Sequence, residues 1–483
     1  MSYRFLVVAA IWFAFSPTGS STAQESSAKP QTGGMPQPME VPDLVATRTL
    51  LLRSRNADQQ PAFDRLYPAP DKWTQGDAAP IFLRMNWEAS SRIKALQDLR
   101  GQVDLGAPLE KLDLDLIDRS LAINLKEMRR FVYRERANWQ YPLHEGPIYD
   151  VLLPDVQESR NYSHALLTQA RYYLVRGTPA EAEPLICMTT GLARHIAETP
   201  ITICRLVAIA QSSNAFDVVE ELLQTPSAGN YYWDMASLPR PLIDLRTAVQ
   251  FDWIWRGIPE LEDLERLETQ QQWERAAGAL YRLLELSNEG EQESEALITD
   301  WVKISRERLP GRLASTDGEL AQRVSSMSDA EVGLRYWMIR YREESERLGN
   351  WSMLEPHEAL VRLGHEELSL KDRIQDEPLV ASLLSDHRAI LLAGSRLDQQ
   401  IAMLRVVEAI RDHLSIHNAL PDSLEALRLP VPIDPMTARP FHYEPDSSGE
   451  QATLASAVLE LPRMHDGHPK TRYGRKYLLK VAR

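Results

Sequence analysis

The chain has 483 residues, of which 43% are hydrophobic and 25% charged, and its formal net charge is -14. This composition is typical of globular proteins and excludes a wholly disordered chain, a collagen-like fibre and a polytopic membrane protein. The acidic balance argues against duplex nucleic acid as the main partner, because phosphate binding needs a basic surface. Two cysteines are too few for a disulfide scaffold or for a zinc site made of cysteines alone.

The N-terminus has the layout of a secretory signal peptide over residues 1–23. Arg4 supplies a positive charge, Phe5–Phe15 is an apolar run, and Ser21-Thr22-Ala23 places small residues before a cleavage site. The apolar run is shorter than the roughly 20 residues that a membrane-spanning helix needs. We therefore expect cleavage before Gln24, export to the periplasm or cell exterior, and no membrane span afterwards. An uncleaved N-terminal anchor is the alternative.

Residues 24–42 are rich in Ser, Pro, Gln and Gly and predict a disordered linker. Residues 43–375 then show apolar positions at three- and four-residue spacing, which predicts amphipathic helices joined by short turns. Such helices form either a bundle or a solenoid-like stack of hairpins, and no fixed-period repeat supports a tetratricopeptide array. The clearest helices are expected at Ser163–Val175, Pro179–Ile196, Pro200–Leu223, Leu261–Leu286 and, with a capping box of Ser328 and Glu331, Ser328–Leu348.

Residues 376–483 change character after one more helical stretch. Leu379–His417 predicts one long helix or two, with Gly394 as the weak point. A turn and a short helix follow, and Ser447-Ser448-Gly449 then offers a hairpin connection. We expect a mainly α fold with a small C-terminal antiparallel sheet packed on the end of the long helix. The predicted strands are Phe441–Glu444, Ala452–Leu459 and Lys476–Ala482.

The segment Leu420-Pro421-Asp422-Ser423-Leu424, the turn Asp434–Pro440 and Tyr443 carry a family resemblance. The C-terminal module resembles that of uncharacterised exported planctomycete proteins, whose helical bodies precede a module similar to the soluble part of type II secretion pseudopilins. The resemblance implies a helical body with a hairpin module and brings no established activity. Two departures are the missing pseudopilin N-terminal motif and a loop at 461–468 that does not support a calcium site. Further upstream matches are Gly76–Pro80, Asn230–Trp233 and Leu238–Pro241.

Histidines supply the metal-site candidates. His413 and His417 are one helical turn apart, a spacing that can place two imidazoles on one metal, with His442 as a third ligand. No Glu follows His413, so the zincin motif is absent. We favour the alternative that both rings cover a core edge and interact with the negative end of the helix dipole, and we expect no cofactor. A second candidate cluster, with a solvated loop as the favoured alternative, comprises His465, Asp466 and His468.

Cys187 and Cys204 lie on consecutive predicted helices with a turn near Thr199. Their axial positions differ by about 8 residues, or about 12 Å at 1.5 Å per residue. A disulfide needs Cα atoms within about 7 Å, so we favour two buried thiols over a bridge, which export would permit.

Aromatic residues gather in one part of the helical region. They suit either the core of a helical array or a platform for sugar rings, and we favour the core. These residues are Tyr231, Tyr232, Trp233, Trp253, Trp255 and Trp273.

The tail from Arg463 to Arg483 carries seven Lys and Arg against one Asp, a net charge of +6, which leaves -20 for the rest of the chain. We expect the basic tail to pack on the acidic body, with an anionic envelope surface or peptide as the alternative. No phosphate-binding loop, dinucleotide fingerprint or nucleophile elbow is present in the sequence. The sequence therefore favours an exported binding or assembly scaffold with envelope or secreted protein partners. The alternatives are an extracytoplasmic hydrolase with acids in an interhelical groove and a component of a secretion-like apparatus.

Overall fold

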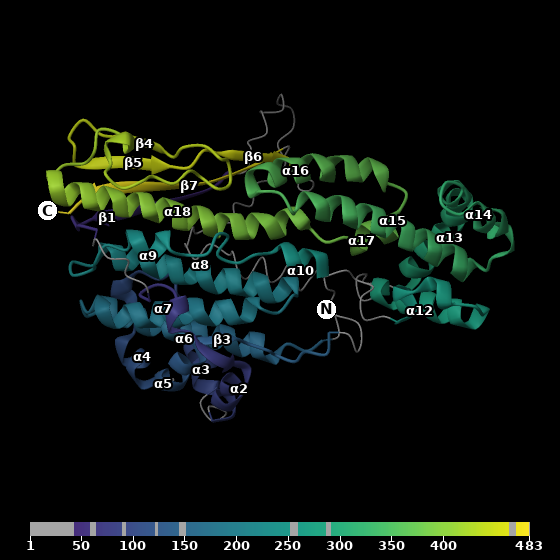
Figure 1. Cartoon of the computed structure of the whole chain (residues 1–483), viewed down its shortest axis with the longest axis horizontal. Helices are drawn as coiled ribbons and strands as arrows, with labels where there is room; N and C mark the ends of the chain where they lie inside the picture. The colour runs from purple at the N-terminus through teal and green to yellow at the C-terminus, as the bar shows by residue number, and fades with distance from the viewer. Residues whose placement is uncertain are drawn as a thin grey trace, which may run out of the picture.

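The computed structural model describes residues 43–57, 64–88, 93–120, 124–143, 151–251, 259–285, 291–462 and 470–482. The predicted signal peptide and linker lie outside these residues. The described chain is mainly α-helical with one small sheet, which confirms the predicted fold class (Figure 1). No helix in the described ranges is long and apolar enough to cross a membrane.

Three antiparallel helices, as predicted, form the centre of the larger hydrophobic core. They are α6 (Pro154–Val175), α7 (Pro179–Ala197) and α8 (Thr202–Gln224), and each packs on the next. Shorter helices cover the side of α6 and α7 that faces away from α8 (Figure 1). These are α2 (Ala79–Glu88), α3 (Ile93–Gln102), α4 (Leu114–Ser120) and α5 (Leu125–Val132), with strands β2 (Thr74–Asp77) and β3 (Arg134–Arg136) paired beside them. Two short helices follow α8, namely α9 (Tyr232–Ala236) and α10 (Arg246–Phe251).

A second, smaller core lies at the other end of the molecule and is built around buried Trp301 and Trp337 (Figure 1). The predicted capping box is confirmed at its first half, since Ser328 Oγ accepts a hydrogen bond from the Glu331 amide at 3.2 Å. The helices are α11 (Pro259–Glu262), α12 (Gln270–Glu285), α13 (Glu291–Leu313), α14 (Gly318–Arg323), α15 (Asp329–Trp351), α16 (Pro356–Arg373) and α17 (Pro378–Leu383). Single 3-10 turns are Pro70–Lys72, Leu109–Lys111, Leu264–Arg266, Val324–Ser326 and Leu424–Ala426.

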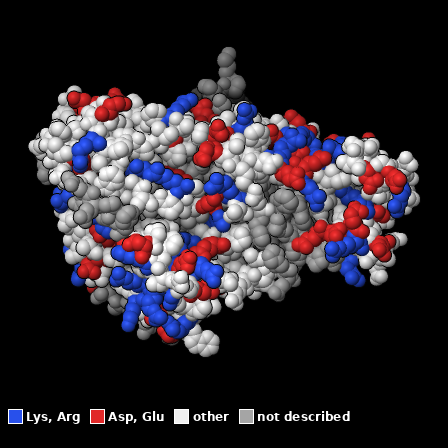
Figure 2. Space-filling view, in the orientation of Figure 1, with Lys and Arg blue, Asp and Glu red and all other residues white. Residues whose placement is uncertain are grey.

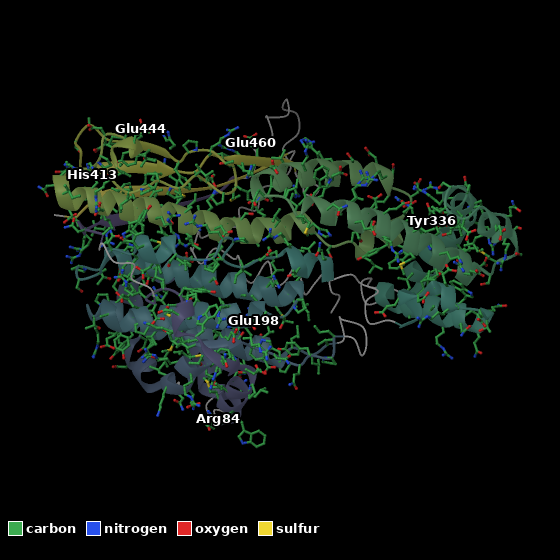
Figure 3. All side chains as sticks on the ribbon, in the orientation of Figure 1. Arg84, Glu198, Tyr336, His413, Glu444 and Glu460 are labelled. Atoms are coloured by element: carbon green, nitrogen blue, oxygen red, sulfur yellow. The ribbon has the colours of Figure 1, made fainter. Side chains whose placement is uncertain are left out.

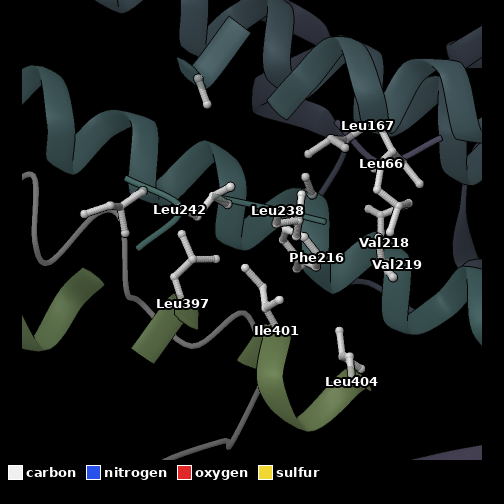
Figure 4. Packing of buried hydrophobic residues seen from close by; sticks show 14 of the residues in the cluster. Leu66, Leu167, Phe216, Val218, Val219, Leu238, Leu242, Leu397, Ile401 and Leu404 are labelled. Carbon is white, nitrogen blue, oxygen red and sulfur yellow. The ribbon is translucent and has the colours of Figure 1, made fainter. Parts of the chain in front are cut away.

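The long helix α18 (His387–His417) spans the larger core. The chain does break within the predicted helical stretch, but before Asp386 and not at Gly394. Asp386 caps α18 by accepting a hydrogen bond from the Ala389 amide at 2.8 Å. Gly394 stays helical, and the absence of a Cβ lets Leu245 pack closely on it, since a Cβ there would lie 3.0 Å from a Leu245 methyl carbon. Leu397 and Ile401 of α18 pack near Leu238 and Leu242, which lie in the segment that follows α8 (Figure 4).

The sheet has the order β1-β7-β5-β4, with β6 also paired to β7. β4 (His442–Pro445), β5 (Gln451–Ala455), β6 (Leu459–Pro462) and β7 (Lys470–Val481) are antiparallel neighbours, as predicted, although the expected strand 452–459 divides into β5 and β6. β1 (Asp43–Leu52) pairs with β7 in parallel, so the helical prediction is wrong for residues 43–52. The first described element therefore belongs to the C-terminal sheet.

Ion pairs connect these layers. Figure 2 shows acidic and basic side chains interspersed over the visible face. Arg475 of β7 bonds Glu220 of α8 at 3.0 Å, so the basic tail does contact the acidic body as expected. Glu220 is buried and also accepts hydrogen bonds from Arg48 and Tyr477, which joins both sheet strands to the helical core.

Candidate functional site

A cavity of about 730 Å³ opens where α18 meets three connections between helices and strands. We call it the proline-rimmed cavity, because the segments around it contribute Pro239, Pro241, Pro356, Pro430, Pro432 and Pro435. One wall is α18, and the others come from residues 235–249, the turn between α15 and α16, and residues 430–438. Its size falls within the roughly 300–1,000 Å³ of typical ligand sites, which often lie between structural units.

Hydrogen bonds hold two of the connections on α18. The amide of Leu242 donates to Asp398 at 3.1 Å. Asp434 is buried and accepts from Gln399 at 3.0 Å and from the Met436 amide at 2.9 Å. The aspartate of the Asp-Pro turn therefore serves the turn itself, while its prolines remain at the cavity.

The cavity walls are largely apolar. Ile390, Ile401 and Val249 line it and belong to the larger core. At its edge, Leu354 is 39% exposed and Ile433 is 59% exposed, values unusual for large apolar side chains. Exposed apolar groups beside a concave surface indicate an interaction site more often than isolated surface leucines do.

Two arginines supply positive charge to this apolar site. Arg405 lies over the Tyr232 ring, with its guanidinium carbon 5.3 Å from the ring centre, and its Nε is buried with no hydrogen-bond partner in the described part of the chain. Among the described residues, Arg240 donates only to the Ala236 carbonyl, at 3.0 Å. Burial, and next the nearby Arg405 charge, lower the pKa of Arg240. Within the described ranges neither guanidinium has a carboxylate at ion-pairing distance.

The acidic groups of the cavity are in different states. Asp244 forms an ion pair with Arg246 at 2.9 Å, and Asp434 is used by its turn. Burial raises the pKa of Asp398 to about 6, so this carboxylate changes charge close to neutral pH. The cavity therefore presents a carboxyl group, that of Asp398, which titrates near the Arg240 cation.

A serine and a histidine also line the cavity. Ser352 Oγ lies 3.5 Å from His387 Nδ1, but it donates to the Leu348 carbonyl at 3.2 Å. Burial lowers the pKa of His387 to about 4, which leaves its imidazole neutral at pH 7. At this distance, and with the hydroxyl proton directed to a carbonyl, the pair is not arranged as a nucleophile and its base.

The predicted histidine pair lies elsewhere, at the C-terminal end of α18 (Figure 3). The ring centres of His413 and His417 are 4.3 Å apart, and the helix ends at Asn418, whose φ is 52°. His442 lies on β4 beside Glu444 at 3.6 Å. Among the described residues no group of three or more His, Cys, Asp or Glu side chains could hold a metal. The second predicted cluster, His465, Asp466 and His468, lies outside those residues.

Both cysteines are buried thiols and neither forms a disulfide, as the sequence favoured. Burial raises the pKa of the Cys187 thiol to about 12, which makes it unreactive at neutral pH. Tyr231, Tyr232 and Trp273 are buried, as expected for core residues, whereas Trp233 is 36% exposed. Trp253 and Trp255 lie outside the described residues.

Two of the segments quoted for the family resemblance line the cavity, and a third lies beside it. Leu238–Pro241 and Asp434–Ala438 contribute to its lining, and Tyr232 supports Arg405. Sequence reasoning missed Arg405 and Asp398, because polar residues in a long helix are expected to face solvent. The pattern that could have revealed them is that apolar residues occur on every side of this helix, which indicates that it is buried all round.

Comparisons with protein-family models, curated proteins and solved structures gave no match for this chain.

Proposed function

We propose that this protein is an exported binding scaffold, and that the proline-rimmed cavity holds an extended apolar segment of an envelope or secreted partner protein. A carboxylate of that segment binds Arg240 and Arg405. The observation that carries the proposal is the pair of guanidinium groups, without carboxylates at ion-pairing distance among the described residues, in a cavity whose walls are largely apolar. Such a site complements a ligand with an apolar body and an anionic end.

A peptide is favoured over a lipid because main-chain groups are also available. Residues 430–434 have no regular secondary structure, and no described hydrogen bond uses the amides of Val431 or Ile433. A bound extended segment can add backbone hydrogen bonds to such a stretch, with side chains entering the pocket. The rigid proline rings lose little conformational entropy when a ligand packs on them.

Export is a proposal from the signal-peptide layout of residues 1–23 and from the resemblance to exported planctomycete proteins. It places the partner outside the cytoplasm. Fractionation of the native organism, with mass analysis of the mature N-terminus, tests it. We expect a species that begins at Gln24 in the soluble extracytoplasmic fraction, and a full-length, membrane-bound species would contradict export.

The binding proposal is tested with a fluorescein-labelled, N-acetylated peptide of Val, Leu and Pro that ends in a free carboxylate. Fluorescence anisotropy measures its Kd for the mature protein. Arg405→Gln should weaken binding by about 10- to 100-fold, the loss of one hydrogen bond to a charged group. Arg439→Gln is the matched control, because Arg439 is exposed in the same turn region and does not line the cavity. The control variant should bind as the wild type does.

Two further arms separate the causes of binding. The same peptide with a C-terminal carboxamide should bind to wild type about as weakly as the acid form binds to Arg405→Gln. Ile433→Asp should also weaken binding, because it places a like charge at the apolar rim. If the wild type and Arg405→Gln each bound the acid and amide peptides equally, the role of the arginines would be refuted. If no peptide bound at all, the peptide site would be refuted.

A further inference from the structure

A second and larger cavity, of about 1330 Å³, lies where β1, α6, α8 and α18 come together. We call it the sheet-side cavity. Its walls are β1, residues 100–108, α6, α8, α18 and Arg475 of β7. It shares no lining residue with the proline-rimmed cavity, so its chemistry can be considered independently of the proposed function.

The three carboxylates that α8 contributes to the sheet-side cavity are already neutralised, and the fourth carboxylate of the lining, Asp104, accepts a hydrogen bond from the Gly106 amide at 2.8 Å. Glu220 bonds Arg48 at 2.6 Å and Arg475 at 3.0 Å, and Asp217 bonds Arg48 at 2.8 Å. Glu221 pairs with the buried Arg171 at 2.8 Å. These carboxylates therefore have no free charge to offer a cation or to compensate further arginines.

Two arginines on the other side lack such compensation. Arg100 of α3 donates to the Asn161 side chain at 3.3 Å, and Arg160 of α6 is 3.5 Å from the Gln157 side chain. Both partners are neutral amides, and no ion pair of either arginine occurs in the described part of the chain. Burial lowers the pKa of both, that of Arg160 to about 10, with the Arg100 charge adding to the effect. Two unneutralised, partly desolvated cations on adjacent helices favour an anion between them.

Two hydrogen-bond acceptors in the same wall also lack partners. His164 Nε2 is 2.9 Å from the Val103 carbonyl, which can only accept, so Nε2 carries the proton and Nδ1 is an acceptor. Burial lowers the pKa of His164 to about 4, so its ring is neutral at pH 7. Ser159 donates to the Val156 carbonyl at 2.7 Å and accepts from Gln211 Nε2 at 2.9 Å, which fixes the Gln211 amide.

His164 Nδ1 and Gln211 Oε1 are consequently buried acceptors without a donor. Unpaired buried acceptors are uncommon and suit hydroxyl donors supplied by a ligand or by water. The cavity is also far larger than a bare oxyanion requires. We infer that the sheet-side cavity binds a small hydroxylated anion, a sugar phosphate or a sugar acid. Its phosphate or carboxylate lies between Arg100 and Arg160, and its hydroxyl groups face His164 and Gln211, whose enclosed acceptor atoms come within reach when these side chains rotate toward the cavity.

Isothermal titration calorimetry with the mature protein tests this inference, with glucose phosphate, glucuronate, inorganic phosphate and neutral glucose as probes. We expect glucose phosphate, glucuronate or both to bind at least about tenfold more tightly than glucose or inorganic phosphate. Arg160→Gln should weaken that binding by about 10- to 100-fold, since one charge-assisted contact is lost. Arg176→Gln is the control, because Arg176 is exposed at the end of the same helix and outside the cavity.

A stability readout distinguishes an anion site from a purely structural arginine. Without ligand, Arg160→Gln should melt at or above the wild-type temperature, because it removes an unneutralised charge that repels Arg100. The best-binding probe should raise the melting temperature of wild type and of Arg176→Gln, but not of Arg160→Gln. Equal binding of glucose and the charged probes, equal loss in both variants, or no binding by any probe would overturn the inference. Preference for the phosphate or for the carboxylate identifies the anionic group.

Discussion

Glu220 offers the sharpest test of how the sheet is attached to the helical core. Its buried carboxylate accepts hydrogen bonds from Arg48 at 2.6 Å, Gln400 at 2.9 Å, Arg475 at 3.0 Å and Tyr477 at 2.5 Å. In Glu220→Ala, Arg48 and Gln400 keep Asp217 as a partner, whereas Arg475 and Tyr477 lose the carboxylate that they share.

The expected cost follows from burial. The Arg48 side chain is 40% exposed, so water can replace much of the hydrogen bonding that it loses with Glu220. Arg48 therefore adds little to the cost of the substitution. The buried Tyr477 hydroxyl loses the acceptor of its proton and keeps only the hydrogen bond that it accepts from Arg475 at 3.3 Å, and an unsatisfied buried donor costs about 1–3 kcal/mol. The Arg475 side chain is 11% exposed and keeps a charge without a counter-ion. Together these losses should lower the free energy of unfolding by about 3–5 kcal/mol, as is usual when one member of a buried ion pair is removed.

Urea unfolding, followed by far-ultraviolet circular dichroism at pH 7, measures the change. The matched control is Glu88→Ala, because Glu88 pairs with Arg84 at 3.9 Å and both side chains are about half exposed. That change should cost less than about 1 kcal/mol. If Glu220→Ala lost no more than the control, Glu220 would not join the sheet to the core energetically, and the reasoning from buried hydrogen bonds would fail.

Three further predictions concern packing, thiol reactivity and pH. Gly191→Ala should lower the free energy of unfolding in urea by about 1–3 kcal/mol, because an added Cβ would lie 2.7 Å from two side-chain carbons. Gly349→Ala, where a Cβ would meet open space, should raise it by up to about 1 kcal/mol. Equal effects of the two substitutions would contradict this packing. Cys187 and Cys204 should react with a thiol reagent only after unfolding, and rapid native labelling would contradict their burial. The pKa of Asp398 is raised in the folded protein. Its contribution to the free energy of unfolding is therefore greatest below pH 4 and is lost as pH rises through about 6. Asp398→Asn should therefore gain about 1–3 kcal/mol relative to wild type between pH 4 and pH 7.5, and a gain independent of pH would refute it.

Much of the helical fold could be predicted because its signals are local. The helices α7, α8 and α15 begin and end close to the predicted residues, since apolar periodicity, prolines and the Ser328 cap act within a few residues of one another. The predicted end of α6 at Val175 is confirmed, but that helix begins at Pro154 and not at Ser163. The hairpin at 446–451 was predicted for the same reason, and Gly449, with a φ of 66°, supplies its left-handed residue. The candidate cavities could not be predicted, because their lining residues come from distant segments whose side chains converge only after packing.

By itself, the sequence determined the mainly α class, the identity of the central helices and the antiparallel hairpin, because backbone preferences and amphipathic periods depend on near neighbours. Tertiary structure decided the rest. Residues 43–52 contain Leu50, Leu51 and Leu52 in a row, which hides a strand alternation that becomes clear only when β1 pairs with β7 and buries the first and third. Arg405, Asp398 and the two uncompensated arginines of the sheet-side cavity acquired their meaning in the same way. A charged side chain costs free energy only where the surrounding fold removes water from it, and only there does its position indicate a ligand or a partner.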